Sequence, residues 1–182
     1  MIVEERMRAY INSLDTGNTP FLEELERFAL ENEVPIIRKE MQSFMKVLLA
    51  VKRPMQVLEV GTAVGFSTLL MCEYSQPEMH ITTIENYEKR IPKARENFRT
   101  IITIERNEKR IKKAKENIKN QGKEEQITLL EGDAIEILKG LDGSFDLIFV
   151  DAAKGQYIHW LPDVVRLLAP GGILLSDNVL QE

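Results

Sequence analysis

The stretch that decides the fold is Val57-Leu58-Glu59-Val60-Gly61-Thr62-Ala63-Val64-Gly65-Phe66-Ser67. Its apolar start predicts a buried strand, and its glycines allow the backbone to turn tightly into a helix and to approach a ligand closely. The spacing of Gly61 and Gly65 is not the G-x-G-x-x-G of a dinucleotide site. Glu59 adds information, because an acid near the end of a buried strand needs a partner, and a cationic ligand amine would supply one.

Short apolar runs alternate with helical stretches from Met55 onwards. The runs are residues 56–60, 127–130, 145–150 and 172–176. Near-continuous apolar strands separated by helices predict a mostly parallel sheet with helices on both faces, so the fold class is α/β and Rossmann-like. Ligands of such sheets bind beyond the carboxyl ends of the strands. The residues that end each strand are therefore the candidates for a functional site.

Residues 1–53 read as helices that cover one side of this core. Pro20 follows Thr19 as expected at a helix start, and Phe21, Leu25 and Phe28 then fall on one face. A length of 182 residues fits one domain overall. We expect residues 1–53 to form an N-terminal helical cover and residues 54–182 to form the ligand-binding core.

Composition excludes several classes of protein. The chain has 24 Lys and Arg against 29 Asp and Glu, and this net charge of −5 argues against non-specific coating of nucleic acid. Its single cysteine, Cys72, cannot form an internal disulfide. The N-terminus does not resemble a signal peptide, and no apolar run approaches the roughly 20 residues of a membrane helix. We therefore expect a cytoplasmic protein without a membrane partner.

A tandem repeat is the most unusual feature. Residues 81–100 (ITTIENYEKRIPKARENFRT) align without gaps to residues 101–120 (IITIERNEKRIKKAKENIKN), with 12 of 20 positions identical. Each copy reads as one strand followed by one helix. The two copies carry 12 Lys and Arg against 6 Asp and Glu, so they hold a charge of +6 while the rest of the chain holds −11. The basic residues form either two solvated helix faces, which we favour, or a surface for RNA phosphates.

Three motifs together point to a known family. The E-x-G-T-x-x-G-x-S pattern of residues 59–67 resembles the cofactor turn of class I S-adenosylmethionine-dependent methyltransferases. The stretches DAAKGQY (151–157) and SDNVL (176–180) resemble the metal-dependent O-methyltransferases that include caffeoyl-CoA and catechol enzymes. With TIERNEKR in the second repeat copy, they are most similar to the bacterial tRNA 5-hydroxyuridine methyltransferases. The resemblance covers nearly the whole chain.

The resemblance implies a divalent metal site. Asp151, Asp177 and Asn178 would be its ligands, and two carboxylates with an amide oxygen suit Mg²⁺, Mn²⁺ or Ca²⁺. The alternative is that Asp151 caps the next helix and Asp177-Asn178 makes a turn. Lys154 would lie near the acceptor oxygen as a catalytic residue beside Asp151, or would be an exposed structural lysine. Metal and ammonium together would lower the pKa of an acceptor hydroxyl.

The resemblance also assigns the S-adenosylmethionine contacts. Glu59 would face the methionine amine, and Asp133 with Ala134 would contact the adenine. The turn around the methionine backbone and carboxylate would be formed by Gly61, Thr62, Gly65 and Ser67, with Asp151 close by.

The ribose needs an acid at the end of the second strand, and the repeat offers two, Glu85 and Glu105. Chain order favours Glu85, because an acid about 20 residues after the glycine turn is usual. Family similarity favours Glu105. If both copies formed strands, the additional strand would push the third strand, and Asp133 with it, outward by about 4.8 Å.

We therefore expect a metal-assisted O-methyltransferase that acts on a hydroxyl beside a second oxygen, with 5-hydroxyuridine in tRNA favoured over a catechol-type small molecule. We also expect a homodimer. The alternative is a non-catalytic cofactor-binding or interaction domain, because the chain stops after its fifth predicted strand, where the family continues through a further helix and a strand pair.

Overall fold

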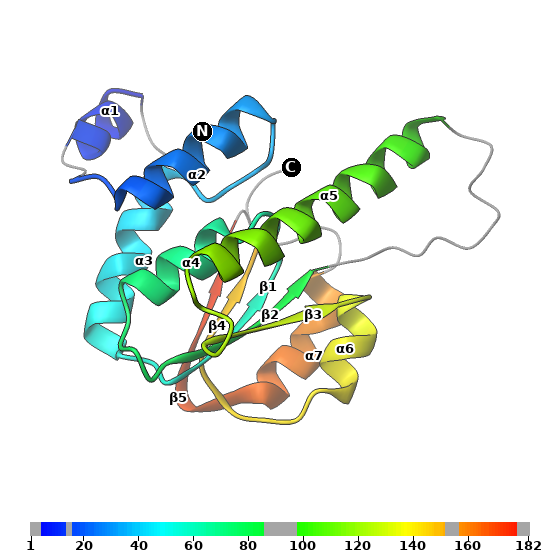
Figure 1. Cartoon of the computed structure of the whole chain (residues 1–182). Helices are drawn as coiled ribbons and strands as arrows, with labels where there is room; N and C mark the ends of the chain where they lie inside the picture. The colour runs from blue at the N-terminus through cyan, green and yellow to red at the C-terminus, as the bar shows by residue number, and fades with distance from the viewer. Residues whose placement is uncertain (1–4, 14–15, 86–97, 152–156, 178–182) are drawn as a thin grey trace.

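The computed structural model describes residues 5–13, 16–85, 98–151 and 157–177 (Figure 1). Its elements in chain order are α1 (Glu5–Ser13), α2 (Pro20–Glu31), α3 (Lys39–Lys52), β1 (Gln56–Val60), α4 (Phe66–Glu73), β2 (His80–Glu85), α5 (Phe98–Asn120), β3 (Ile127–Glu131), α6 (Ala134–Gly140), β4 (Phe145–Val150), α7 (Tyr157–Leu167) and β5 (Leu168–Ser176). The predicted runs 56–60 and 145–150 are confirmed to the residue, and the last strand begins four residues earlier than expected.

The strands form one sheet in the order β3-β2-β1-β4-β5, and every neighbouring pair is parallel. The order reverses beside β1, where β2 lies on one side and β4 on the other. All carboxyl ends therefore meet at one edge, and the glycine turn after β1 lies at its centre. The α/β, Rossmann-like fold is confirmed.

Side chains of the central strands alternate between two apolar layers. Val57, Leu147 and Phe149 pack with α2, α3 and α4, whereas Leu58 and Ile148 pack with α6 and α7. Figure 1 shows the two helical layers on opposite sides of the sheet. This period of two explains why the strands read as continuous apolar runs, since both faces are covered.

Most of the described residues before β1 lie in the helices α1, α2 and α3, as expected. α2 and α3 place Leu22, Leu25, Met45 and Leu49 in the same apolar cluster as α4 and the sheet. A membrane-spanning helix is not found anywhere in the described ranges, where each helix is too short or too polar.

The repeat does not form two strand–helix units. Residues 81–85 of the first copy lie in β2, but residues 101–105 of the second copy lie in α5. β2 pairs directly with β3, so the expectation of a strand from each copy is wrong. The physical reason is that the sheet has room for only one strand between β1 and β3, and the first copy fills that position. Glu85 and Glu131 are consequently direct neighbours across the sheet.

Candidate functional site

The turn after β1 is held by its own backbone. The N–H of Gly65 donates to the carbonyl oxygen of Thr62 at 2.8 Å, and the N–H of Leu69 then donates to the Gly65 carbonyl to start α4. Gly61 and Gly65 have φ of 112° and 83°, which explains the need for glycine at both positions. Ala63 lies between them at φ 47°, a left-handed conformation that costs energy for a residue with a Cβ.

Glu59 is fully buried, and its partners are hydroxyl groups. Its carboxylate accepts hydrogen bonds from Ser67 Oγ at 2.5 Å, Thr68 Oγ1 at 2.5 Å and Thr83 Oγ1 at 2.6 Å. We predicted a ligand amine as the partner of this acid, but the protein itself satisfies it. Ser67 is 7% exposed and Glu59 is 0% exposed, so Ser67 is the more accessible member of this hydrogen-bonded pair.

Burial raises the pKa of Glu59 from 4.5 to about 7. The three hydroxyl donors oppose this rise because they stabilise the carboxylate, and the charge of Asp151 adds to it. The environment of Glu59 therefore includes the acid that ends the neighbouring strand β4.

Glu85 connects β2 to the glycine turn. Its carboxylate accepts a hydrogen bond from the N–H of Ala63 at 2.6 Å. Burial raises the pKa of Glu85, while the Ala63 N–H and the charge of Arg110 lower it. The structure thus places Glu85, the acid that chain order favours, at the carboxyl edge beside the turn. Glu105 belongs to a residue range whose backbone lies in α5.

Asp133 and Ala134 lie where β3 gives way to α6. Asp133 is the N-cap of α6, and its side chain accepts a 2.8 Å hydrogen bond from the N–H of Ile135. Ala134 is 6% exposed and opens the helix. Asp133 therefore has a structural role that the sequence analysis did not consider, next to its predicted contact with adenine.

Asp151 and Asp177 directly follow the neighbouring strands β4 and β5. The register pairs Val150 with Ser176, so the two acids are adjacent at the carboxyl edge. Backbone bonds fix both, because Asp151 N–H donates to Val60 O and Asp177 N–H donates to Val150 O, each at 3.0 Å. Both side chains are partly exposed. Asn178 and Lys154 lie outside the described residues.

Tyr157 ties these strand ends together. Its hydroxyl lies 2.8 Å from the carbonyl oxygen of Asp177 and 3.2 Å from that of Val150. Two carboxylates on adjacent strand ends are a donor set that suits a hard divalent cation. Among the described residues no group of three His, Cys, Asp or Glu could hold a metal, and Asn178, which the family resemblance implies as the third ligand, lies outside them.

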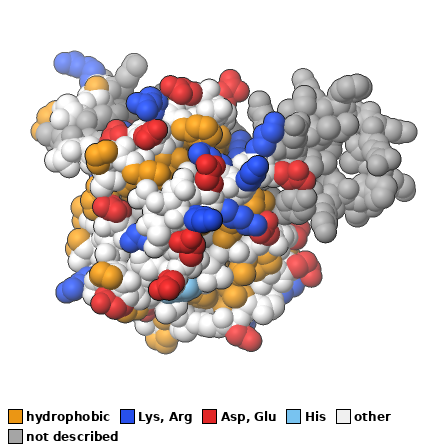
Figure 2. Space-filling model, viewed as in Figure 1, with side chains coloured by type: hydrophobic (Ala, Val, Ile, Leu, Met, Phe, Trp, Pro, Cys, Tyr) orange, Lys and Arg blue, Asp and Glu red, His pale blue; other side chains and the backbone are white. Residues whose placement is uncertain are grey.

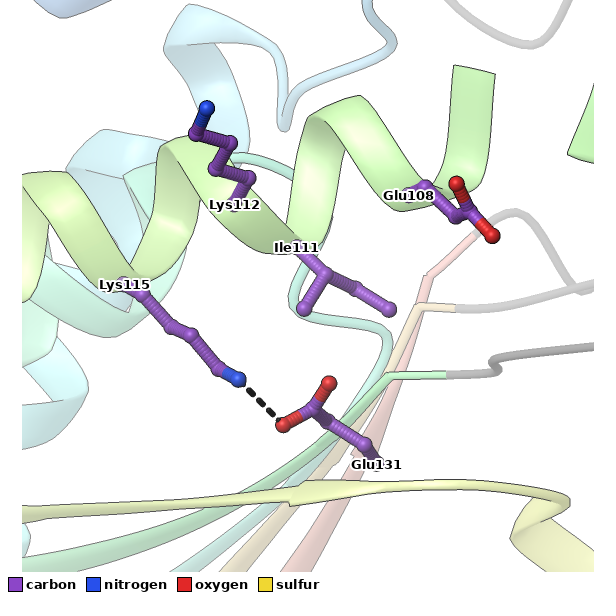
Figure 3. Close-up of a pocket in the computed structure, with 5 residues that line it drawn as sticks. All are labelled: Glu108, Ile111, Lys112, Lys115 and Glu131. Carbon is purple, nitrogen blue, oxygen red and sulfur yellow. Dashed lines mark ion pairs between the residues drawn. The ribbon is translucent and has the colours of Figure 1, made fainter. Parts of the chain in front are cut away.

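A shallow pocket of about 210 Å³ lies between α5 and the end of β3, lined by Glu108, Ile111, Lys112, Lys115 and Glu131 (Figure 3). Lys115 forms a 2.5 Å ion pair with Glu131, and Lys112 points away from that pair. The charges lining the pocket are mixed. It therefore does not have the character of an anion site.

The face that carries α5 is also mixed in charge (Figure 2). Lys113 lies 3.5 Å from Glu116, and Lys115 pairs with Glu131. The positive charge of the repeat is partly balanced here by acids of α5 and β3. The choice between a solvated helix face and a surface for RNA stays a prediction, because half of the basic residues of the repeat lie outside the described side chains.

Sequence reasoning missed three buried polar residues that hold the site, and one of them is Thr68, whose hydroxyl donates to Glu59. Thr83 lies in β2 and bonds to both Glu59 and Thr62, with 2.6 Å between the two threonine oxygens. Asn117 of α5 is 2% exposed and donates to the carbonyl oxygen of Val64 at 2.8 Å. A threonine within a buried strand was a usable signal, whereas Asn117 looked like any polar helix residue.

Family models match this chain in two overlapping ranges. One described as a methyltransferase domain matches residues 58–179, and one described as O-methyltransferase matches residues 12–100. The chain is 26% identical over 176 residues to a catechol O-methyltransferase of Mycobacterium tuberculosis, which covers 95% of this chain and 71% of that protein. A catechol O-methyltransferase of Niastella koreensis is 32% identical over 143 residues, covering 76% of this chain and 56% of that protein.

Solved structures agree with these matches. The SAH-bound Podospora anserina methyltransferase PaMTH1 superposes with a TM-score of 0.77 at 28% identity, covering 95% of this chain and 68% of that one. An O-methyltransferase from Bacillus cereus in complex with SAH has a TM-score of 0.76 at 20% identity, which supports the fold. The chain spans only about half the length of several other curated relatives that it matches.

Proposed function

The chain belongs to the methyltransferase domain family, and on that premise we propose that it is an S-adenosylmethionine-dependent, divalent-metal-assisted O-methyltransferase. The observation that carries the proposal is the convergence of the glycine turn, Glu85, Asp151 and Asp177 at one edge of the sheet. A negatively charged edge beside a tight turn suits a cofactor that carries a sulfonium and an ammonium group.

The turn and Glu85 would bind the cofactor. One oxygen of Glu85 already accepts the Ala63 N–H, so its other oxygen is placed to accept hydrogen bonds from ribose hydroxyls. Ser67 donates its proton to Glu59, which directs the lone pairs of Ser67 away from the acid. Ser67 can therefore accept a hydrogen bond from the ammonium group, with Glu59 acting behind it.

Asp151 and Asp177 would hold the metal, with Asn178 as the third protein ligand. A bound divalent ion lowers the pKa of a hydroxyl next to it and so favours the nucleophilic oxyanion. Other residues of the chain hold these two carboxylates in position. Tyr157 fixes the backbone at Asp177, and the carbonyl of Val60 fixes Asp151. Lys154 would contribute a positive charge near the acceptor.

The acceptor would carry a hydroxyl with a vicinal oxygen, because both oxygens can then chelate one ion. Catechols and 5-hydroxyuridine share this geometry. The names of the relatives support a catechol, whereas the TIERNEKR motif supports 5-hydroxyuridine in tRNA. Because of that motif, we propose 5-hydroxyuridine in tRNA as the favoured substrate.

Methyl transfer from radiolabelled S-adenosylmethionine tests the proposal. Purified full chain is incubated with Mg²⁺ and either a simple catechol or tRNA that contains 5-hydroxyuridine. Label in either acceptor supports the activity and identifies the acceptor class. Cofactor binding by calorimetry without label in either acceptor would instead support a non-catalytic cofactor-binding domain. The expected homodimer and cytoplasmic location stay predictions, and sedimentation velocity tests the former.

A further inference from the structure

The second repeat copy can fill the β2 slot residue for residue. In β2, Ile81, Thr83 and Ile84 are 0%, 0% and 1% exposed. Residues 101–105 present the same types at these places, and also at Glu85: Ile101, Thr103, Ile104 and Glu105. The one difference within these five residues is Ile102 for Thr82, which is only partly buried. A strand made from residues 101–105 would therefore lose no buried side chain.

The polar contacts of β2 would also be reproduced. Thr83 donates to Glu59 and lies 2.6 Å from the Thr62 oxygen, and Glu85 accepts from the Ala63 N–H. Each bond depends on the residue type and on its place in the strand. Thr103 and Glu105 have the same type and the same spacing, so they can make the same bonds to β1 and its turn.

Connection lengths favour an exchange in which α5 keeps its position. Connections from a strand to the following helix commonly have about 2 to 6 residues. In the structure, residues 86–97 connect β2 to α5, whereas only Arg106 and Asn107 would connect a strand of residues 101–105 to a helix that begins at Glu108. All buried residues of α5 that the structure describes lie beyond Glu108: Ile111, Ala114, Asn117 and Ile118. Figure 1 shows the start of α5 projecting away from the sheet.

The residues that precede each copy explain why the first copy, and not the second, forms β2. Met79 is 0% exposed, and His80 lies 2.9 Å from Thr128 through its ring nitrogen. The equivalent residues before the second copy are Arg99 and Thr100. Arg99 would bring a charge where Met79 is buried, which disfavours the second copy without affecting the strand itself.

Exchange of the helices is less favourable than exchange of the strands. The first-copy helix has Pro92 where α5 has Lys112, and Phe98 where α5 has Ile118, which is 5% exposed. Proline removes a helical hydrogen bond, and phenylalanine overfills a packed site. The second-copy helix therefore stays against the sheet in both arrangements.

We propose that residues 81–85 and 101–105 are interchangeable β2 strands, and that Glu105 replaces Glu85 as the cofactor-binding carboxylate when the second copy occupies the slot. The role of Glu105 rests on the proposed function, whereas the strand exchange does not. The first copy gives the major form and the second copy a minor one. The site keeps the same set of residue types in both.

Disulfide trapping tests the exchange without any cofactor. Thr82 and Thr128 are paired across β2 and β3, and neighbouring strands place Cα atoms within disulfide range. Thr82→Cys with Thr128→Cys should crosslink in most molecules on oxidation. Ile102→Cys with Thr128→Cys should crosslink more slowly, as the minor form is trapped. Peptide mass spectrometry quantifies both products.

The control is Ile102→Cys alone, which reports any pairing with Cys72. That native thiol is buried and its pKa is raised to about 12, so it should stay reduced. Absence of the 102–128 crosslink, under conditions that complete the 82–128 crosslink, would overturn the exchange. Formation of the 102–128 crosslink supports it even if S-adenosylmethionine does not bind.

A double-mutant cycle tests the role of Glu105. Calorimetry measures S-adenosylhomocysteine binding to the full chain and to Glu85→Gln, Glu105→Gln and the double variant. We expect Glu105→Gln alone to change Kd by less than about twofold, because the major form binds through Glu85. We expect Glu85→Gln to weaken binding about tenfold, because the cofactor must then select the minor form. In the Glu85→Gln background, Glu105→Gln should cost about a further tenfold.

Glu108→Gln in the Glu85→Gln background is the matched control, since Glu108 is exposed and lies after the exchanged strand. If Glu105→Gln matches this control in that background, Glu105 is not a cofactor residue and the proposal fails. If the wild-type chain binds no cofactor, the proposed function fails, and the crosslinks alone decide the exchange.

Discussion

The carboxylate of Glu85 accepts a 2.6 Å hydrogen bond from the N–H of Ala63, so the end of β2 is fastened to the turn that follows β1. This bond holds Ala63 at φ 47°, between two glycines that also have positive φ. The acid that we assign to the cofactor ribose therefore also shapes the turn that would receive the methionine part. Binding and turn geometry are coupled through one side chain.

Substitution of Ala63 tests the backbone conformation of the turn. Ala63→Val should lower the free energy of unfolding by about 2 kcal/mol, because a β-branched residue is strained at positive φ. Ala63→Gly keeps the N–H and should stay within about 1 kcal/mol of wild type. Urea unfolding measures both. Equal losses for the two variants would contradict the assigned conformation.

Glu59 should make stability fall with rising pH. Its pKa is about 7 in the folded chain against 4.5 for an exposed acid, so the folded state holds the proton more tightly between these values. The free energy of unfolding should therefore decrease from about pH 4.5 to about pH 7 and level off above it. The full effect is about 3 kcal/mol. Urea unfolding at a series of pH values measures it.

Glu59→Gln is the control for that experiment. Glutamine does not titrate, and the hydroxyls of Ser67, Thr68 and Thr83 can rotate to donate to it or to accept from it. The variant should show a flatter profile over the same range. An unchanged pH dependence would mean that another group is responsible.

Tyr157→Phe should weaken metal binding more than cofactor binding. The hydroxyl of Tyr157 contacts the carbonyl oxygens of Asp177 and Val150, so its loss loosens the backbone that presents the metal carboxylate. We expect the Mg²⁺ concentration for half-maximal activity to rise about tenfold. S-adenosylhomocysteine affinity should change less than twofold. His159→Ala, an exposed change on the same helix, should leave both unchanged.

Most of the fold follows from the sequence because the central strands are buried on both faces. Phe145–Val150 has no polar alternation apart from Asp146, which lies near the strand start and accepts hydrogen bonds from the N–H groups of Met55 and Gln56. The second repeat copy was the exception. Its ITIE has the local pattern of a strand, but a sheet admits one strand per slot, and only tertiary structure decides which copy takes it.

The site was predictable where strand ends supply acids and not where partners come from other elements. Glu85 was found because an acid is expected at the end of the second strand, whereas Asp151 and Asp177 were assigned from the resemblance to metal-dependent O-methyltransferases and also lie directly after strands. The hydroxyl partners of Glu59 come from α4 and β2, so the sequence offered only the acid and suggested a ligand amine. The capping role of Asp133 escaped notice because the same residue also matched a family position.

Metal dependence of methyl transfer tests the central claim most directly. Transfer from S-adenosylmethionine to a catechol and to 5-hydroxyuridine tRNA is measured with Mg²⁺ and with excess chelator, for wild type, Asp151→Ala, Asp177→Ala and the exposed control Asp142→Ala. We expect wild type and control to be active and chelator to abolish that activity. We expect the two site variants to lose at least about 100-fold in activity. Full transfer by the Asp151→Ala and Asp177→Ala variants in the presence of chelator would contradict it.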